Sequence, residues 1–499
     1  PQAVASWRTR LAELRRDLHA RITAALPGAA GAVASALMTG ERGAIPPQVV
    51  ADMRESGLAH LLAISGLHVG LVTGVLFFGL RGLLALFPAV ALRYPIKKWA
   101  AVVALVGGGI YTLMTGATVP TQRAFLMTGL VFGAVLVDRA AISMRLVAWA
   151  ALVVLVIAPQ SLTGPSFQMS FAAVIALVAV YERARGLFAR GRGAGVGRRI
   201  AFYVAGVALT TLVAGLATAP FAVFHFNRMA RFGLIANLGA VPVTALWVMP
   251  WSVVAYLLAP LGLEGWALTA MGWGLDAVLW IAHGVASLPG AAVSMPEMPV
   301  SAMVLIALGG LWLALWKTRL RVAGLALLGA GLIVALWARP PDLVIAGDGE
   351  SFAVRDSSGG IVFAGDSLPR FERETWLRRS GAEESSDARK RPAFPTGAAD
   401  GRLTCDALAC VYRARGQTVS LIRDPAAAAE DCMRADVVVA LVPLGRLRCQ
   451  GPARIIGFFD LWREGGHAIW LDPAPRVATV ASYRGRRPWA PEKRTRGRR

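Results

Sequence analysis

Ten apolar stretches run along the first two thirds of the chain, between Leu61 and Trp337. Several approach the roughly 20 residues that a helix needs to cross a hydrocarbon core, and the shorter ones suit re-entrant segments or helices buried inside a bundle. Beyond residue 339 the pattern changes to short β-type runs separated by turn residues. We therefore predict an α-helical polytopic membrane protein of about ten spans with a C-terminal soluble α/β domain. The stretches are 61–80, 99–114, 120–137, 146–158, 166–181, 201–222, 232–258, 266–287, 300–316 and 322–338.

Composition supports a membrane protein. The chain has 499 residues, of which 56% are hydrophobic and 16% charged, against about 45–50% and about 25% in a typical soluble domain. This excludes a disordered chain and argues against an ordinary cytosolic enzyme. The formal net charge of +22 favours lipid head groups or nucleic acid as partners, because isolated buried charges are costly. The first residue is Pro and no short apolar leader follows, so we expect an N-terminal portion to be missing.

Basic residues divide the predicted loops into two sets. One set of alternate loops carries fifteen Lys and Arg residues, whereas the other carries only Arg228 and Arg231. Since Lys and Arg are retained on the cytoplasmic side, the first set is predicted to be cytoplasmic. An even number of spans then places the residues before 61 and after 339 outside. The basic set is Arg81, Arg93, Lys97, Lys98, Arg139, Arg145, Arg183, Arg185, Arg190, Arg192, Arg198, Arg199, Lys317, Arg319 and Arg321.

The chain divides into four predicted parts. Residues 1–28 contain apolar positions at helical spacing with Arg on the other faces, which predicts an amphipathic interfacial helix or, equally, a surface helix of a missing domain. Residues 29–339 form the transmembrane domain and 340–483 the extracytoplasmic α/β domain. Residues 484–499 form a basic tail. We expect either a disordered segment that binds phosphate groups or a solvated segment that has no ligand. Its candidate phosphate contacts are Arg486, Arg487, Arg494, Arg496 and Arg498.

All four cysteines lie in the segment predicted to be outside the cytoplasm, where disulfides persist. Of the three possible connectivities we expect neighbours to pair, Cys405 with Cys410 and Cys432 with Cys449. A four-thiolate zinc site is the alternative, but the spacings lack the paired C-x-x-C of a zinc ribbon.

Polar residues inside the apolar stretches are the candidate functional groups. They should face protein or a water-filled path, and for each one a hydrogen bond between helices is the alternative role. Asp276 lies in the middle of a stretch, so we expect it to be protonated, paired or in contact with water, with Arg123 as one candidate partner. The candidate path residues are His60, Ser65, Gly66, His68, Arg123, Gln168, Ser170, His225, Asn237 and Asp276.

Four sequence blocks give these residues a context. They read HLLAISGLHVG at 60–70, TVPTQRAFLM at 118–127, SFQMSFAAV at 166–174 and TAPFAVFHFNRMARFGLIANLGAVP at 218–242. In this order they resemble the ComEC competence proteins, the bacterial inner-membrane channel for DNA uptake. The resemblance implies passage of single-stranded DNA into the cytoplasm during natural transformation. It favours a phosphate contact for Arg123 in the channel mouth, with a side chain that reaches the lipid head groups as the alternative. It also implies a periplasmic DNA receptor and a cytoplasmic motor or single-strand-binding proteins as partners.

The chain departs from that family at both ends. The family usually begins with two spans and an OB-fold, to which we assign no residues here. Many members end in a metallo-β-lactamase-like domain with a histidine cluster, whereas residues 340–499 contain one histidine, His467. We therefore expect a degenerate metallo-β-lactamase-like domain with no metal, no cofactor and no catalysis. A membrane-bound metal-dependent nuclease fused to a channel and a small-solute transporter are the alternatives, and the chain has no P-loop lysine pattern.

Overall fold

The computed structural model describes residues 7–139, 143–189, 196–364, 369–381, 401–445, 451, 454–485 and 487. The chain divides into two compact units. The first comprises Pro1–Val293 and Val300–Ala335, and the second Ser294–Pro299 and Leu336–Arg499.

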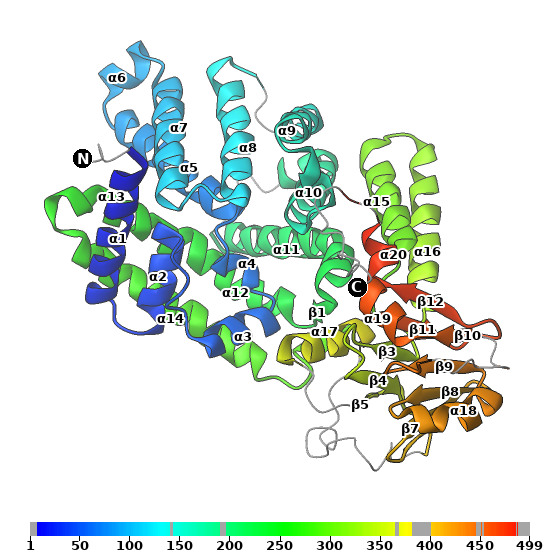
Figure 1. Cartoon of the computed structure of the whole chain (residues 1–499). Helices are drawn as coiled ribbons and strands as arrows, with labels where there is room; N and C mark the ends of the chain where they lie inside the picture. The colour runs from blue at the N-terminus through cyan, green and yellow to red at the C-terminus, as the bar shows by residue number, and fades with distance from the viewer. Residues whose placement is uncertain are drawn as a thin grey trace. The chain divides into compact units, whose positions relative to one another are not determined.

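The first unit is built from helices. Figure 1 shows α5, α7 and α8 side by side. The helices are α1 (Trp7–Ala25), α2 (Ala29–Thr39), α3 (Pro47–Glu55), α4 (Ala59–Leu62), α5 (Gly66–Ala85), α6 (Pro88–Arg93), α7 (Ile96–Met114), α8 (Val119–Leu136), α9 (Met144–Ile157), α10 (Pro165–Ala189), α11 (Val196–Phe226), α12 (Gly233–Val243), α13 (Met249–Leu258), α14 (Glu264–Ala286), α15 (Val300–Leu315) and α16 (Val322–Trp337). A two-stranded sheet pairs β1 (Arg228–Ala230) with β2 (Ala292–Ser294).

Each of the ten predicted stretches falls on a helix, and the predicted class of helical membrane protein is confirmed. Seven helices in the described part of the chain are long and apolar enough to cross a membrane, and α9 and α15 are shorter apolar helices. The seven are Gly66–Ala85, Ile96–Met114, Val119–Leu136, Pro165–Ala184, Ala201–Phe226, Gly233–Leu261 and Arg319–Trp337. The count of ten spans therefore stays a prediction.

The span from Gly233 to Leu261 is not a regular helix. It joins α12 and α13 through a π-helical turn at Thr244–Val248, which lies between Pro242 and Pro250. A proline removes one backbone donor and crowds the preceding turn, so wider helical turns are a common response. Thr244 Oγ1 donates to the Ala240 carbonyl oxygen at 2.8 Å, which satisfies its hydroxyl locally.

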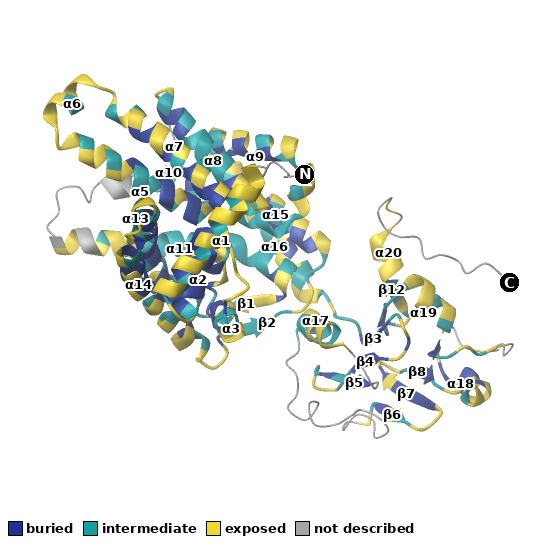
Figure 2. Ribbon diagram, turned by 60° about the vertical axis from the view of Figure 1, so that its left-hand side comes forward, coloured by how far each residue is buried: buried dark blue, intermediate teal, exposed yellow. Residues whose placement is uncertain are grey.

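The N-terminal helices belong to the core of the first unit. Leu18 and Ile22 of α1 are buried in one cluster with residues of α2 and α14 (Figure 2). Leu14, by contrast, is 53% exposed. The apolar face that suits a membrane interface is thus covered by protein over its C-terminal half. The boundary predicted at residue 28 falls between α1 and α2, and both helices lie in the same unit. The boundary therefore stays a prediction.

The second unit contains two five-stranded sheets. One is antiparallel throughout, in the order β12-β11-β3-β4-β5, and the other has the order β10-β9-β8-β7-β6, with parallel pairing on both sides of β9. The strands are β3 (Leu343–Ile345), β4 (Phe352–Arg355), β5 (Ile361–Ala364), β6 (Leu403–Cys405), β7 (Ala409–Ala414), β8 (Gln417–Ile422), β9 (Val437–Ala440), β10 (Arg454–Ile456), β11 (His467–Trp470) and β12 (Arg476–Thr479). The helices are α17 (Arg370–Ser380), α18 (Ala428–Arg434), α19 (Phe458–Glu464) and α20 (Val480–Arg484).

Strand β9 shows how the layers form. Val437 and Val439 lie in a core shared by residues of both sheets, whereas Val438 packs on Ala428 and Cys432 of α18. Alternating residues of a strand point to opposite faces, so a run of valines buries both faces at once. The predicted soluble α/β domain is confirmed in this coarse form.

A buried carboxylate fastens two segments of this unit. Arg415 Nε donates to Asp342 Oδ1 at 3.0 Å, and the Leu471 backbone N–H donates to Asp342 Oδ2 at 2.9 Å. The hydrogen bond to Asp342 raises the pKa of Arg415. Burial raises the pKa of the neighbouring Tyr412 to about 12, and its hydroxyl donates to the Arg355 carbonyl oxygen.

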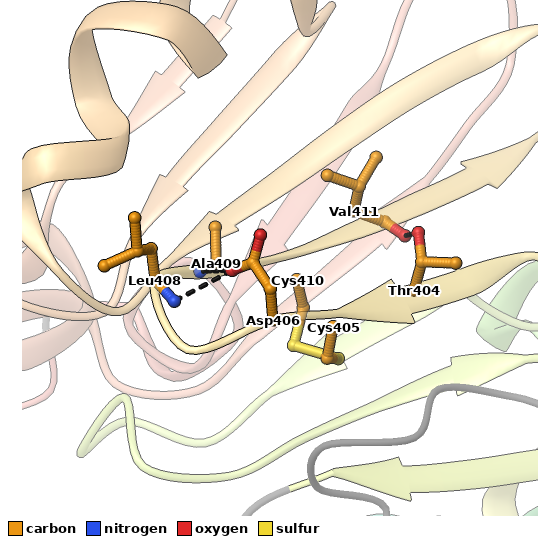
Figure 3. The surroundings of a disulfide bond; sticks show 7 residues. All are labelled: Thr404, Cys405, Asp406, Leu408, Ala409, Cys410 and Val411. Atoms are coloured by element: carbon orange, nitrogen blue, oxygen red, sulfur yellow. Dashed lines mark hydrogen bonds between the residues drawn. A yellow bond between two sulfur atoms is a disulfide. The ribbon is translucent and has the colours of Figure 1, made fainter.

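Figure 3 shows the disulfide between Cys405 and Cys410, which joins β6 to β7. The Asp406 carboxylate accepts the backbone N–H groups of Leu408 and Ala409 at 2.8 and 2.7 Å, which closes the connecting turn. This is one of the two neighbour pairs expected. Cys432 is also disulfide-bonded, and Cys449 lies outside the described residues.

Candidate functional site

The turn before the first long span is fixed by a glycine and a histidine. Gly57 has φ +80°, and a Cβ there would lie 2.9 Å from the Ala230 Cβ. Eight residues later the chain enters α5, where the Ser65 backbone N–H donates to His68 Nδ1 at 3.2 Å. The ring nitrogen that accepts is unprotonated, so the proton of the neutral ring is on Nε2. His68 is fully buried, and its Nε2 has no hydrogen-bond partner among the described residues.

Arg123 lies in the first turns of α8. Its Nη2 donates to Ser166 Oγ of α10 at 2.6 Å, and the residue is only 6% exposed. Within the described ranges, Arg123 forms no ion pair with a carboxylate. A guanidinium group stays charged in proteins, so this buried cation has one neutral hydroxyl as its hydrogen-bond partner. Such a group favours an anion that enters its surroundings.

A second hydrogen bond joins α10 to α11. His225 Nε2 lies 2.8 Å from Gln168 Oε1, and Gln168 Nε2 donates to the Leu162 carbonyl oxygen at 3.0 Å. An amide oxygen can only accept, so His225 Nε2 donates and carries the proton. The Gln168 side chain therefore fastens the end of α11 to the turn before α10.

These contacts connect all four sequence blocks in a closed cycle. A Cβ at Gly66 would lie 3.8 Å from the Ala124 Cβ, which joins residues 57–70, the first block with the three residues before it, to 118–127. The hydrogen bonds of Arg123 and Gln168 join 118–127 to 166–174, and 166–174 to 218–242. The contact of Gly57 with Ala230 closes the cycle. We call these four segments the four-block cluster.

The other predicted path residues differ in burial and in their contacts. His60 is exposed, with Nδ1 3.2 Å from the Gly57 carbonyl oxygen, and Ser170 is half-buried. Asn237 is half-buried and donates to the Gly233 carbonyl oxygen of its own helix. Asp276 lies on an exposed face of α14 with Trp273 and Trp280. In the described part of the chain Arg123 is therefore bonded to Ser166 and not to Asp276, the partner considered from the sequence.

Two cavities accompany the bundle, and neither is lined by any of the ten candidate path residues. The smaller, of about 340 Å³, lies beside Tyr181 and Thr210, whose hydroxyls are 2.6 Å apart. The larger has about 870 Å³ and lies among α8, α9, α10 and α15.

The second unit offers no grouped metal ligands among the residues that the structure describes. His467 is buried, its Nδ1 lies 2.7 Å from the Gly465 carbonyl oxygen, and its Nε2 lies 3.9 Å from the Glu464 carboxylate. Of the tail arginines, Arg487 is exposed, and Arg486, Arg494, Arg496 and Arg498 lie outside the described residues.

Three residues were missed by sequence reasoning. Ser166 accepts the hydrogen bond from Arg123. Its position as the first residue of the third block could have identified it as a candidate. Gly57 makes the tightest approach in the cluster. Asp52 pairs with His283 Nδ1 at 2.9 Å, and nothing in the sequence pattern marks that pair.

A family model described as competence protein matches residues 37–320, more than half of the chain. The chain belongs to the competence protein family. The resemblance drawn from the four blocks is thereby confirmed.

Two relatives share part of this region. ComE operon protein 3 of Bacillus subtilis (strain 168) is 25% identical over 257 residues, which are 51% of this chain and 30% of that protein. Competence protein ComA of Neisseria gonorrhoeae is 32% identical over 197 residues, 38% of this chain and 28% of that protein. The chain therefore spans less than a third of the length of these curated relatives. No solved structure matches it.

Replacing Gly57 tests the closure of the cluster. We expect Gly57→Ala to lower the melting temperature of the purified protein in detergent by about 2–10 °C more than Gly262→Ala does. Both glycines have positive φ, but a Cβ at Gly262 would meet nothing within 4 Å, so the difference isolates the contact with Ala230. Equal melting temperatures for the two variants would contradict the tight approach.

Proposed function

We propose that this chain is an inner-membrane channel subunit that conducts single-stranded DNA into the cytoplasm during natural transformation. Family membership and the apolar helices support a role in DNA uptake across a membrane. The observation that carries the proposal is Arg123, a buried cation without a carboxylate partner among the described residues, placed where the second and third blocks meet.

The cluster lies at one end of its helices. The contacts involve the beginnings of α8 and α10, the end of α11 and the turn before α5. The loops at this end are poor in Lys and Arg, which supports an extracytoplasmic position. The strand then meets the cluster first and leaves toward the basic loops, and the residues after 339 lie on the extracytoplasmic side.

A translocating strand must be attracted but not retained. One guanidinium group that is hydrogen-bonded to a neutral serine attracts a phosphate group, but it binds the strand less tightly than a ring of several cations would. His68 Nε2 offers a further donor in another segment of the four-block cluster. Because Arg123 and His68 are buried, conduction requires the four-block cluster to open, and Arg123 exchanges Ser166 for a phosphate oxygen as it does so.

We further propose that the second unit is a degenerate metallo-β-lactamase-like domain without catalytic activity. Two facing sheets with α18 on an outer side support the fold. The proposal that this domain has no metal centre is supported by the contact of His467 Nδ1 with the Gly465 carbonyl oxygen, which lies just before β11. Motion of the strand then depends on a cytoplasmic motor or single-strand-binding proteins, and its delivery on a periplasmic DNA receptor.

Substitution of Arg123 tests the phosphate contact. In a transformable bacterium lacking its own homologue, we expect Arg123→Gln to reduce transformation frequency by about tenfold to a hundredfold, because a charge-assisted hydrogen bond is lost. Arg123→Lys should retain part of the activity, and Arg228→Gln, an exposed arginine at the same end, should retain all of it. Immunoblots of membranes check that the amounts are equal. Full transformation with Arg123→Gln would refute the assignment.

Cysteine labelling tests the orientation. Gln160 and Arg319 are exposed and follow α9 and α15, respectively. We expect an impermeant maleimide to label Gln160→Cys in intact cells and Arg319→Cys only after permeabilisation, with the parent chain as background. The reverse pattern would invert every inside and outside assignment.

The non-enzymatic proposal is tested with labelled single strands and Mn²⁺ or Zn²⁺. We expect the purified full chain to leave the strands intact over hours. Cleavage that disappears in His467→Ala would favour the metal-dependent nuclease instead.

A further inference from the structure

The larger cavity combines positive charge with an apolar wall. Its volume is about 870 Å³, and Arg139, Arg145 and Lys317 line it together with one acidic residue, Glu182. The three basic residues come from two loop regions of the basic set, the one between α8 and α9 and the one after α15, and Glu182 lies on α10. Arg183 Nη2 also donates to the Trp316 carbonyl oxygen at 3.2 Å, which holds α10 against the end of α15.

The charges around this cavity are only partly neutralised. Lys317 Nζ lies 4.0 Å from Glu182 Oε2, a distance at the limit of an ion pair. Arg139 and Arg145 are exposed, and neither forms an ion pair with another described residue. Two arginines beside an opening of this size favour an anionic group.

The remaining wall suits hydrocarbon. It includes Leu130, Trp149 and Leu315, and Trp149 is 61% exposed. Gly133 of α8 also lines the cavity, and a Cβ there would meet nothing within 4 Å. The open space therefore continues along α8 from the arginines toward the apolar part of the helices.

We propose that this cavity binds an anionic phospholipid, with its phosphate beside Arg139 and Arg145 and an acyl chain along the wall of Gly133 and Trp149. Cationic recesses between membrane helices, at the level of the head groups, are suited to such lipids. A nucleic-acid strand would need a polar path on both sides of the arginines and would leave this wall uncovered. The bound lipid would join α8, α9, α10 and α15. This inference is independent of strand conduction.

Native mass spectrometry of the full chain in detergent tests the site, with phosphatidylglycerol and phosphatidylcholine as probes. We expect one phosphatidylglycerol to be retained where phosphatidylcholine is lost. The double variant Arg139→Gln/Arg145→Gln should bind phosphatidylglycerol roughly thirtyfold more weakly. Gly133→Leu, which fills the space without changing the charge, should also weaken retention while the melting temperature without lipid stays unchanged.

The matched control is Arg93→Gln/Arg319→Gln, which removes the same charge from two exposed positions outside the cavity. It should bind phosphatidylglycerol as the parent does. Three results would overturn the proposal: equal retention of both lipids, an equal loss in the control, or displacement of the lipid by inorganic phosphate or a ten-nucleotide single strand at comparable concentration.

Discussion

Hydrocarbon offers no hydrogen-bond partner, and this constraint explains most of the arrangement of the first unit. Hydroxyl groups inside the helices donate to carbonyl oxygens of their own preceding turns, as Thr73, Thr112 and Thr210 do. Other polar side chains form hydrogen bonds to a neighbouring helix. Arg123 and His225 therefore meet Ser166 and Gln168, and the helix ends that carry them are drawn together.

The helical part of the fold was largely predictable, because long apolar runs have few alternatives in a membrane. What could not be predicted was which helix lies beside which. Periodicity shows the apolar side of one helix but not its neighbour, so the bond between Arg123 and Ser166 was not foreseen. Asp276 illustrates the same limit: its place in an apolar run left protonation, pairing and contact with water open, and only the structure shows that it lies on an exposed face of α14.

The second unit was harder to read because its strands are short. A valine run such as β9 is a clear strand signal, since buried parallel strands are rich in β-branched residues. Strands β6 and β11 carry a weaker signal: they have three and four residues, and β11 begins with a histidine. Their pairing depends on partners distant in sequence, as in the register of β11 with β3. Local propensity carries little information about such contacts.

Charge distribution links the two proposals. In the proposed function, a strand attracted by Arg123 would move toward the end of the helical unit that bears most of its basic residues. If all of those cations faced the strand, its phosphates would be bound too tightly to leave, because counterion release makes each such contact favourable. A lipid phosphate between Arg139 and Arg145 would neutralise part of this charge permanently. The same arginines would then favour the orientation of the chain in the membrane without retaining the polyanion that crosses it.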